Sequence, residues 1–342
     1  MTKRLISIIT PFYNSEKFMD IPYKSLINQT YQNWEWICVD DKSTDNTLKI
    51  LEEWAQKDSR IKVVAREKNG GNAASGFNSG IPFISSSHVQ ILGHDDELTP
   101  ETLEEIVKRI EETQADIIIP DVEIVNELID SKMQNFIMTG ISPDKKDKRY
   151  KANDRSVVLD GYEACKLTIS WRIHGWACYA TELLKQTGFI EEGMNGDEYS
   201  ERLFFLNARK VAFSSGTYRY LRRPTSITHK LSVKYFNQFP TQDKLQQLIR
   251  KNHFGRKYEK VQNNCLLTVY FSYQMKLLTK GCELSKEDYR EVQKIMEYGR
   301  KLQWKYCSVI EIFACRLKYF KYLSFYKIWK FLDKKLRKKG YV

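Results

Sequence analysis

Several features are missing from this sequence, and each absence excludes a class of protein. No stretch of about 18 uncharged apolar residues occurs, so the sequence predicts no transmembrane helix. The N-terminus, residues 1–4 followed by a strand-like run, lacks the apolar core of a signal peptide. The seven cysteines form no Cys-x-x-Cys pair. They therefore predict reduced thiols in a cytoplasmic protein, not a zinc site or a disulfide framework.

Acidic residues are also scarce in one part of the chain. Residues 300–339 contain thirteen Lys or Arg but only two acids, Glu311 and Asp333, so this stretch carries +11 of the net charge of +12. The remainder is close to electrically balanced, which indicates two unlike parts. We expect an α/β domain over residues 1–233 and a helical, basic region over 234–342.

The first part alternates strand-like and helix-like segments. Apolar runs that predict strands lie at 5–9, 34–39, 61–65, 89–92 and 116–119, with two short candidates at 211–213 and 218–221. Helices are expected between them, one of them opening at residues 14–16 and another with Thr99 as its N-cap and Pro100 at its first position. This order predicts an α/β fold with a mostly parallel sheet and helices on both faces. Ligands would then bind at the carboxyl ends of the strands.

A dinucleotide-binding enzyme shares this alternation but needs a Gly-x-Gly-x-x-Gly turn after the first strand. Residues 10–15 contain no glycine. The sequence therefore argues against a nicotinamide-dependent dehydrogenase.

The most informative segment is the acidic turn Gly93-His94-Asp95-Asp96-Glu97, which follows the fourth predicted strand. Adjacent carboxylates repel each other, so gathering them at a strand end is costly unless a cation lies between them. Hard oxygen ligands suit Mg²⁺ or Mn²⁺ bound to a substrate phosphate. A solvated acidic turn before a helix is the alternative interpretation.

Further clusters follow the other strands, and together they resemble a known family. The first strand leads into Thr10-Pro11-Phe12-Tyr13-Asn14, and the second into Val39-Asp40-Asp41-Lys42-Ser43-Thr44-Asp45. With Asn69-Gly70-Gly71-Asn72 and the acidic turn, these segments are similar to the motifs of the family 2 glycosyltransferases. The resemblance covers roughly residues 4–230 and implies a GT-A fold with a helical C-terminal extension.

The resemblance implies a nucleotide-sugar site. Its nucleotide-sugar-binding residues would be Pro11, Tyr13, Glu16, Asp40, Asn72, His94 and Asp95. Asp40 would accept a hydrogen bond from a uracil-type N–H. The alternatives are that Tyr13 is a core aromatic residue and that Asp40 caps a turn.

The resemblance also implies a divalent cation, Mg²⁺ or Mn²⁺, held by Asp95, with Asp96 and His229 as further candidate ligands. The chain departs from the family motif at its first acid, which is Gly93 here. We expect weaker or rearranged ribose binding as a result. A non-catalytic glycan- or lipid-binding relative with a degenerate motif is the alternative.

Catalytic and acceptor residues are implied further along the chain. Asp197 aligns with the family's catalytic base, with Glu198 as a nearby substitute, although acids in the first turn of a helix are favourable in any protein. Trp171 and Trp176 lie where relatives form an acceptor-side loop, and simple packing is their alternative. The ending Tyr218-x-Tyr220-x-Arg222-Arg223 places two arginines near the diphosphate.

The implied activity is inverting transfer of a single sugar from a nucleotide-diphosphate sugar, UDP-linked by preference. The acceptor would be a hydroxyl of a glycan or polyprenyl-linked molecule in surface polysaccharide biosynthesis. Processive relatives carry a Gln-x-x-Arg-Trp motif and membrane spans, which this sequence lacks.

The basic C-terminal region has an amphipathic pattern. Apolar residues at 325, 328, 329, 332 and 336 share one helical face, and lysines and arginines occupy the other. This pattern is typical of a helix at an anionic membrane surface. It predicts a peripheral protein on the inner face of the plasma membrane, against the alternative of an ordinary packing helix. No motif supports nucleic-acid binding.

Overall fold

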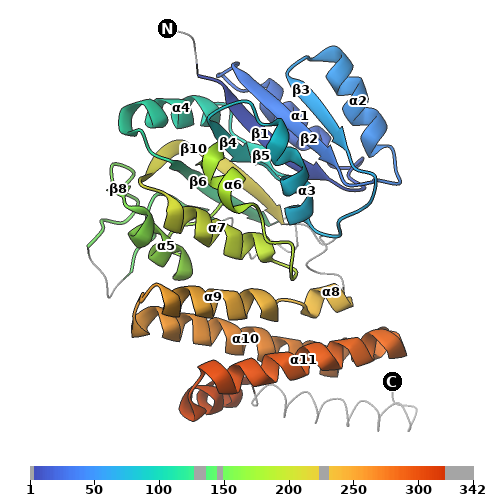
Figure 1. Cartoon of the computed structure of the whole chain (residues 1–342), viewed down its shortest axis with the longest axis vertical. Helices are drawn as coiled ribbons and strands as arrows, with labels where there is room; N and C mark the ends of the chain where they lie inside the picture. The colour runs from blue at the N-terminus through green and yellow to red at the C-terminus, as the bar shows by residue number, and fades with distance from the viewer. Residues whose placement is uncertain (1–3, 127–135, 145–148, 223–230, 320–342) are drawn as a thin grey trace, which may run out of the picture. The chain divides into compact units, whose positions relative to one another are not determined.

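The computed structural model describes residues 4–126, 136–144, 149–222 and 231–319 (Figure 1). The chain divides into two compact units, Met1–Ser226 and Ile227–Val342. The first unit is built on a β-sheet, and the described part of the second is helical.

The sheet of the first unit has ten strands, in the order β3-β2-β1-β4-β9-β6-β10-β5, with β7 paired to β6 and β8 to β10. Their bounds are β1 (Ile6–Phe12), β2 (Trp34–Asp40), β3 (Ile61–Ala65), β4 (His88–Ile91), β5 (Glu97–Leu98), β6 (Ile117–Asn126), β7 (Phe136–Met138), β8 (Val158–Leu159), β9 (Cys178–Ala180) and β10 (Val211–Arg222). Strands β3, β2, β1 and β4 are parallel, whereas β9 runs antiparallel to both β4 and β6.

Helices pack on both faces of the sheet, as predicted. Their bounds are α1 (Asp20–Ile27), α2 (Thr47–Lys57), α3 (Ala73–Gly80), α4 (Thr102–Thr113), α5 (Gly161–Ile169), α6 (Thr181–Thr187) and α7 (Gly196–Asn207). Apolar residues of α1, α2 and α4 share one core with Ile8 and Trp36. The last residue of α3 lies instead against Ile9 and Ile37, whose side chains point to the opposite face because strand residues alternate.

Two helices begin later than the sequence pattern predicts, because polar residues at their expected starts bind elsewhere. Helix α1 begins at Asp20, since Asn14 adopts a left-handed backbone and the Ser15 N–H donates to the Thr47 hydroxyl at 2.8 Å. Helix α4 begins at Thr102 and has no side-chain cap. The Thr99 hydroxyl accepts from the N–H of Thr217 in β10, at 2.9 Å, instead of capping that helix.

The sheet differs from the predicted one in its second half. The short segments predicted at 211–213 and 218–221 form one strand, β10, with a register shift between Phe213 and Thr217. The short strands β5, β7, β8 and β9 were not predicted. Their antiparallel pairings make the sheet mixed, although the parallel part β3-β2-β1-β4 is as expected.

The second unit contains α8 (Val233–Phe236), α9 (Phe239–Lys251), α10 (Arg256–Lys280) and α11 (Lys286–Tyr306), followed by a helical stretch at 309–319. Aromatic residues such as Phe236, Phe239 and Phe271 fill its core. None of the helices in the described ranges is both long and apolar enough to cross a bilayer. The predicted amphipathic pattern at 325–336 lies outside the described residues.

Candidate functional site

The predicted donor-site segments follow neighbouring parallel strands. Phe12 at the end of β1 is paired in register with Asp40 at the end of β2, and β4 lies on the other side of β1. The loops after these three strands therefore leave the sheet at the same edge. This edge carries residues 13–16, 41–46 and 93–96.

The loop after β1 is fastened to the loop after β2 by hydrogen bonds. The Glu16 carboxylate accepts from the backbone N–H and the side-chain amide of Asn46, at 3.0 and 2.9 Å. Asp40 is buried and accepts from the N–H of Ser43, with 3.2 Å as the shorter distance. Tyr13 is exposed and Pro11 is half-buried. The structure thus leaves the Tyr13 ring available at this edge and holds Asp40 beneath the loop.

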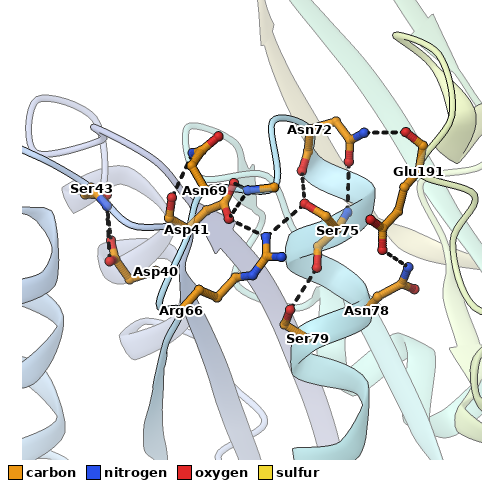
Figure 2. A network of polar contacts seen from close by, with 11 residues as sticks. Asp40, Asp41, Ser43, Arg66, Asn69, Asn72, Ser75, Asn78, Ser79 and Glu191 are labelled. Carbon is orange, nitrogen blue, oxygen red and sulfur yellow. Dashed lines mark hydrogen bonds and ion pairs between the residues drawn. The ribbon is translucent and has the colours of Figure 1, made fainter.

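A polar network extends from the end of β2 to the loop before α7 (Figure 2). The buried Asp41 pairs with Arg66 and accepts from the N–H of Gly70 at 2.9 Å. Arg66 also donates to the Ser75 hydroxyl at 2.9 Å. Asn72 caps α3 by accepting from the Ser75 N–H.

The network continues beyond Asn72 to the opposite loop. The side-chain amide of Asn72 donates to the backbone carbonyl of Glu191 at 2.6 Å. The side-chain amide of Asn78 donates to the Glu191 carboxylate at 2.8 Å. Both ends of the Asn72 amide therefore bind protein groups. This arrangement ties the loops after β2 and β3 to the segment that leads into α7 (Figure 2).

Tyr218 of β10 organises the acidic turn after β4. Its hydroxyl accepts from the N–H of Gly93 at 3.0 Å and donates to the Asp96 carboxylate at 2.6 Å. The other Asp96 oxygen accepts from the N–H of Leu221 at 3.0 Å. Asp96 is buried, and these bonds fix the turn onto β10.

The same turn has no room for a side chain at its first position. A Cβ at Gly93 would lie 2.2 Å from a carboxylate oxygen of Asp96, well inside contact distance. The neighbouring Asp95 is partly exposed, with the imidazole Nε2 of His94 4.0 Å from its carboxylate. Glycine at position 93 is therefore part of how this turn packs.

Helix α7 carries three acids around one buried arginine. Arg202 lies 3.3 Å from the carboxylates of both Glu198 and Glu201, and Glu198 also accepts from the side-chain amide of Asn195 at 2.6 Å. Asp197 precedes them in the first turn, and its carboxylate accepts from the N–H of Glu198 at 3.0 Å. The three carboxyl groups of this cluster thus have one guanidinium, that of Arg202, among them.

The excess negative charge changes the acidity of this cluster. Burial raises the pKa of Asp197, and the Glu198 carboxylate raises it further. Burial also raises the pKa of Glu201 to about 8, with Arg202 opposing it and Asp197 and Glu198 adding to it. The Glu201 carboxyl therefore holds its proton to a higher pH than an ordinary glutamate, while Arg202 contacts both Glu198 and Glu201.

The raised pKa of Glu201 predicts that the free energy of unfolding depends on pH. Glu201 binds its proton more tightly in the folded than in the unfolded chain, so its contribution is fully present below the ordinary glutamate pKa and is lost as the pH rises through about 8. The variant Glu201→Gln keeps a neutral group of the same shape. Its free energy of unfolding should match wild type near pH 4 and exceed it increasingly towards pH 9. Denaturant titrations across this range measure the difference, and a constant difference would contradict the assignment.

Tyr220 of β10 is close to acids from two separate segments. Burial raises the pKa of its hydroxyl, and the carboxylates of Asp96, Asp95 and Asp197 raise it further, while Arg222 opposes them. The acidic turn after β4 and the start of α7 therefore lie within electrostatic reach of one side chain. The candidate base and the candidate metal ligand thus both raise the pKa of the Tyr220 hydroxyl.

The two predicted acceptor-side tryptophans have different surroundings. Trp176 is partly buried, and its ring lies 5.1 Å from that of Tyr220 and 5.8 Å from that of the buried His174. Trp171 is half exposed, has a left-handed backbone and lies over the Arg202 guanidinium, 5.2 Å from ring centre to Cζ. Trp176 thus packs beside Tyr220 and His174, and Trp171 presents a half-exposed ring to solvent.

The remaining predicted ligands are placed only in part. Arg222 is exposed at the end of β10, whereas Arg223 and His229 lie outside the described residues. Within the described ranges, no three His, Cys, Asp or Glu side chains are grouped as a metal site. Asp95 is the predicted ligand best placed to bind a cation, because Asp96 already accepts from Tyr218 and Leu221.

Sequence reasoning missed several residues of this site. Tyr218 and Tyr220 belong to a sequence motif that does not itself show their role, although their spacing of two in a strand places them on one face. Glu201 and Arg202 gave no signal beyond a charged helix. The Asp41–Arg66 pair joins two loops far apart in the sequence, so the pairing could not be predicted from local pattern.

Residues 7–169 match the family model described as glycosyl transferase family 2. Over these residues, which lie in its first unit, the chain is similar to the family 2 glycosyltransferases. The match ends before α7, so the candidate base lies outside the matched residues.

Individual relatives agree with this similarity. The chain is similar to glycosyltransferase GlyG of Streptococcus pneumoniae, with 28% identity over 65% of this chain and 72% of that protein. It is 34% identical to a poly(ribitol-phosphate) beta-glucosyltransferase of Bacillus spizizenii over 35% of this chain and only 19% of that protein. Its fold resembles that of S. aureus TarS residues 1–349 in complex with UDP-GlcNAc, with a TM-score of 0.61, 18% identity and coverage of 92% and 91% of the two chains. These likenesses bear out the GT-A fold.

Proposed function

We propose that this protein transfers a single sugar, with inversion, from a UDP-linked donor to an acceptor hydroxyl. The observation that supports the proposal is that the carboxylates of Asp95, in the turn after β4, and Asp197, at the start of α7, both raise the pKa of the Tyr220 hydroxyl. Glycosyl transfer needs these two kinds of group at one carbon: one at the leaving diphosphate and one at the attacking hydroxyl.

The donor nucleotide is proposed to lie along the ends of β1 and β2. The exposed Tyr13 ring offers a stacking surface for the base, beside Pro11, and Asp40 offers an acceptor for its N–H group. The Asp41–Arg66 network supports this loop from below, and Glu16 fastens it to Asn46. Arg222, exposed and near Tyr220, is proposed to approach the diphosphate.

A divalent cation is proposed at Asp95. Mg²⁺ in proteins is commonly held by one or two carboxylates together with substrate phosphate oxygens, so a single partly exposed aspartate fits such an ion without an all-protein cage. When bound, Mg²⁺ or Mn²⁺ would act as a Lewis acid on the departing diphosphate. Asp96 and Tyr218 hold the turn that presents Asp95.

Asp197 is proposed as the general base. It would take the proton of the acceptor hydroxyl as that oxygen bonds to the anomeric carbon and the bond from this carbon to the diphosphate oxygen breaks. The raised pKa of Asp197, caused first by burial, makes it a better proton acceptor than an exposed aspartate. Attack from the side opposite the diphosphate inverts the configuration.

The acceptor is proposed to be a hydroxyl of a glycan or a polyprenyl-linked molecule of a surface polysaccharide. Trp171 presents a half-exposed ring beside α7, on which a sugar could stack, and Trp176 packs beside Tyr220. The poly(ribitol-phosphate) named in one relative is a polymer with free hydroxyls. The enzyme is proposed to act in the cytoplasm on the inner face of the plasma membrane.

Donor hydrolysis and thermal shift test the proposal together. With Mn²⁺ present, UDP-sugars should raise the melting temperature and be slowly hydrolysed, and a chelator should abolish hydrolysis. GDP-sugars tested alongside define the base preference. Binding without metal-dependent hydrolysis would favour a non-catalytic relative, and no response to any nucleotide sugar would reject both interpretations.

A further inference from the structure

The helical stretch at 309–319 is anchored to the second unit by one of its faces. Ile312, Cys315 and Tyr319 pack against the aromatic core of this unit, and Tyr319 stacks on Phe271 with ring centres 5.7 Å apart. Glu311 lies on the same side, where it accepts from the N–H and hydroxyl of Ser308 at 2.8 and 2.9 Å. The position of this helix on its own unit is therefore set by its inner face.

The opposite face of this helix is apolar and exposed. Its members are Val309 (67% exposed), Ile310 (80%), Phe313 (61%) and Leu317 (54%). At 100° per residue these four side chains fall within an arc of about 100°. We call them the outer stripe. Trp304, at the end of α11 and 60% exposed, is a further large apolar residue close in sequence.

Basic residues lie on both sides of the outer stripe. On the same helical projection Arg316 falls about 20° beyond one edge, and Lys318 falls about 80° beyond the other. Both are exposed, and Glu311, the one acid of the described helix, falls about 20° beyond Lys318 on the same projection. An apolar arc between cations is the arrangement of a helix that lies in a membrane interface.

We propose that the outer stripe is the surface by which this protein binds an anionic lipid bilayer, with its apolar side chains among the acyl chains and Arg316 and Lys318 at the headgroups. The proposal rests on the membrane location proposed above, and it names the residues that would make the contact with the membrane. Charge decides the occupant. A second copy would bring the same positive charge to the contact, since the described residues 300–319 hold five Lys or Arg and one acid, whereas anionic lipid is complementary.

Vesicle binding by the full-length chain tests the proposal. Vesicles of equal parts phosphatidylcholine and phosphatidylglycerol should co-sediment the protein, and pure phosphatidylcholine vesicles should bind it much less. The double variant Phe313→Asp/Leu317→Asp should lower binding to the mixed vesicles by roughly 100-fold, because two inserting side chains become charged. Phe83→Asp is the matched control, since Phe83 is also half exposed but lies in the first unit, and its binding should equal wild type.

Each alternative outcome is distinct. Unchanged binding by the double variant would overturn the proposal, and so would a change from dimer to monomer with vesicle binding retained, which would indicate a second copy on the outer stripe. Unfolding is checked by the melting temperature, and the single variant Ile310→Ser provides a milder second test. Failure of wild type to bind mixed vesicles, with Mn²⁺-dependent donor hydrolysis intact, would reject the membrane surface and leave the proposed transfer standing.

Discussion

Replacing Asp197 with asparagine is expected to lower turnover by about 100- to 10,000-fold while leaving donor affinity unchanged, because asparagine cannot take the proton of the acceptor hydroxyl. The side chain keeps its size, and its amide oxygen can still accept from the N–H of Glu198. The folded structure should therefore persist. Single-turnover transfer measures the chemical step, and titration with the donor measures binding.

Two further variants sharpen this test. Glu198→Gln tests whether the neighbouring acid is the base instead. Because the Glu198 carboxylate already binds Arg202 and Asn195, this variant should lower turnover much less than Asp197→Asn does. Glu182→Gln changes an exposed acid of α6 and should behave as wild type. The assignment of Asp197 as the base would be wrong if Asp197→Asn kept wild-type turnover, or if Glu198→Gln lost more turnover than Asp197→Asn.

The second large effect is expected at the acidic turn, where adjacent aspartates should respond differently. Asp95→Asn should abolish the stimulation of turnover by Mn²⁺ with little change in stability, because this partly exposed side chain is the proposed metal ligand. Asp96→Asn should instead lower the free energy of unfolding by about 1–3 kcal/mol, because its amide would place a donor against the Tyr218 hydroxyl or the Leu221 N–H.

Denaturant unfolding and metal titration separate the two outcomes. The control Tyr218→Phe removes the hydroxyl that joins Gly93 to Asp96, so it should reproduce the instability of Asp96→Asn and retain metal stimulation. The division of roles would be wrong if Asp96→Asn abolished metal stimulation at unchanged stability. Equal metal responses in wild type and Asp95→Asn would contradict the ligand assignment.

Much of the sheet could be predicted because its local pattern and its tertiary setting agree. The predicted strand at 61–65 coincides with β3, and β1, β2 and β4 differ from prediction only by a few residues at their ends. These strands are apolar and β-branched, and turn residues bound them, so burial reinforces their local preference. Strand β9 was missed because three residues carry no periodicity, and its antiparallel pairing with β4 and β6 depends on segments distant in sequence.

The helix starts show how tertiary contacts override local signals. Thr99 followed by Pro100 is a favourable start for a helix, yet the Thr99 hydroxyl accepts from Thr217 of β10 and α4 begins at Thr102. Asn14 and Ser15 are likewise bound to the loop after β2. A capping residue is predicted from its neighbours in sequence, but its hydrogen bond goes to whichever partner folding brings near.

Neighbouring residues carry the resemblance to the family 2 glycosyltransferases, the alternation of strands and helices, and the acids after β1, β2 and β4, so these features could be predicted. Folding alone fixes that Asp96 holds its turn through Tyr218, that one arginine is shared by Glu198 and Glu201, and that Asp95 and Asp197 both raise the pKa of Tyr220. These relations join residues as far apart in sequence as Asp96 and Tyr218, which are separated by 122 positions. Their energies depend on burial and distance, which no local pattern contains.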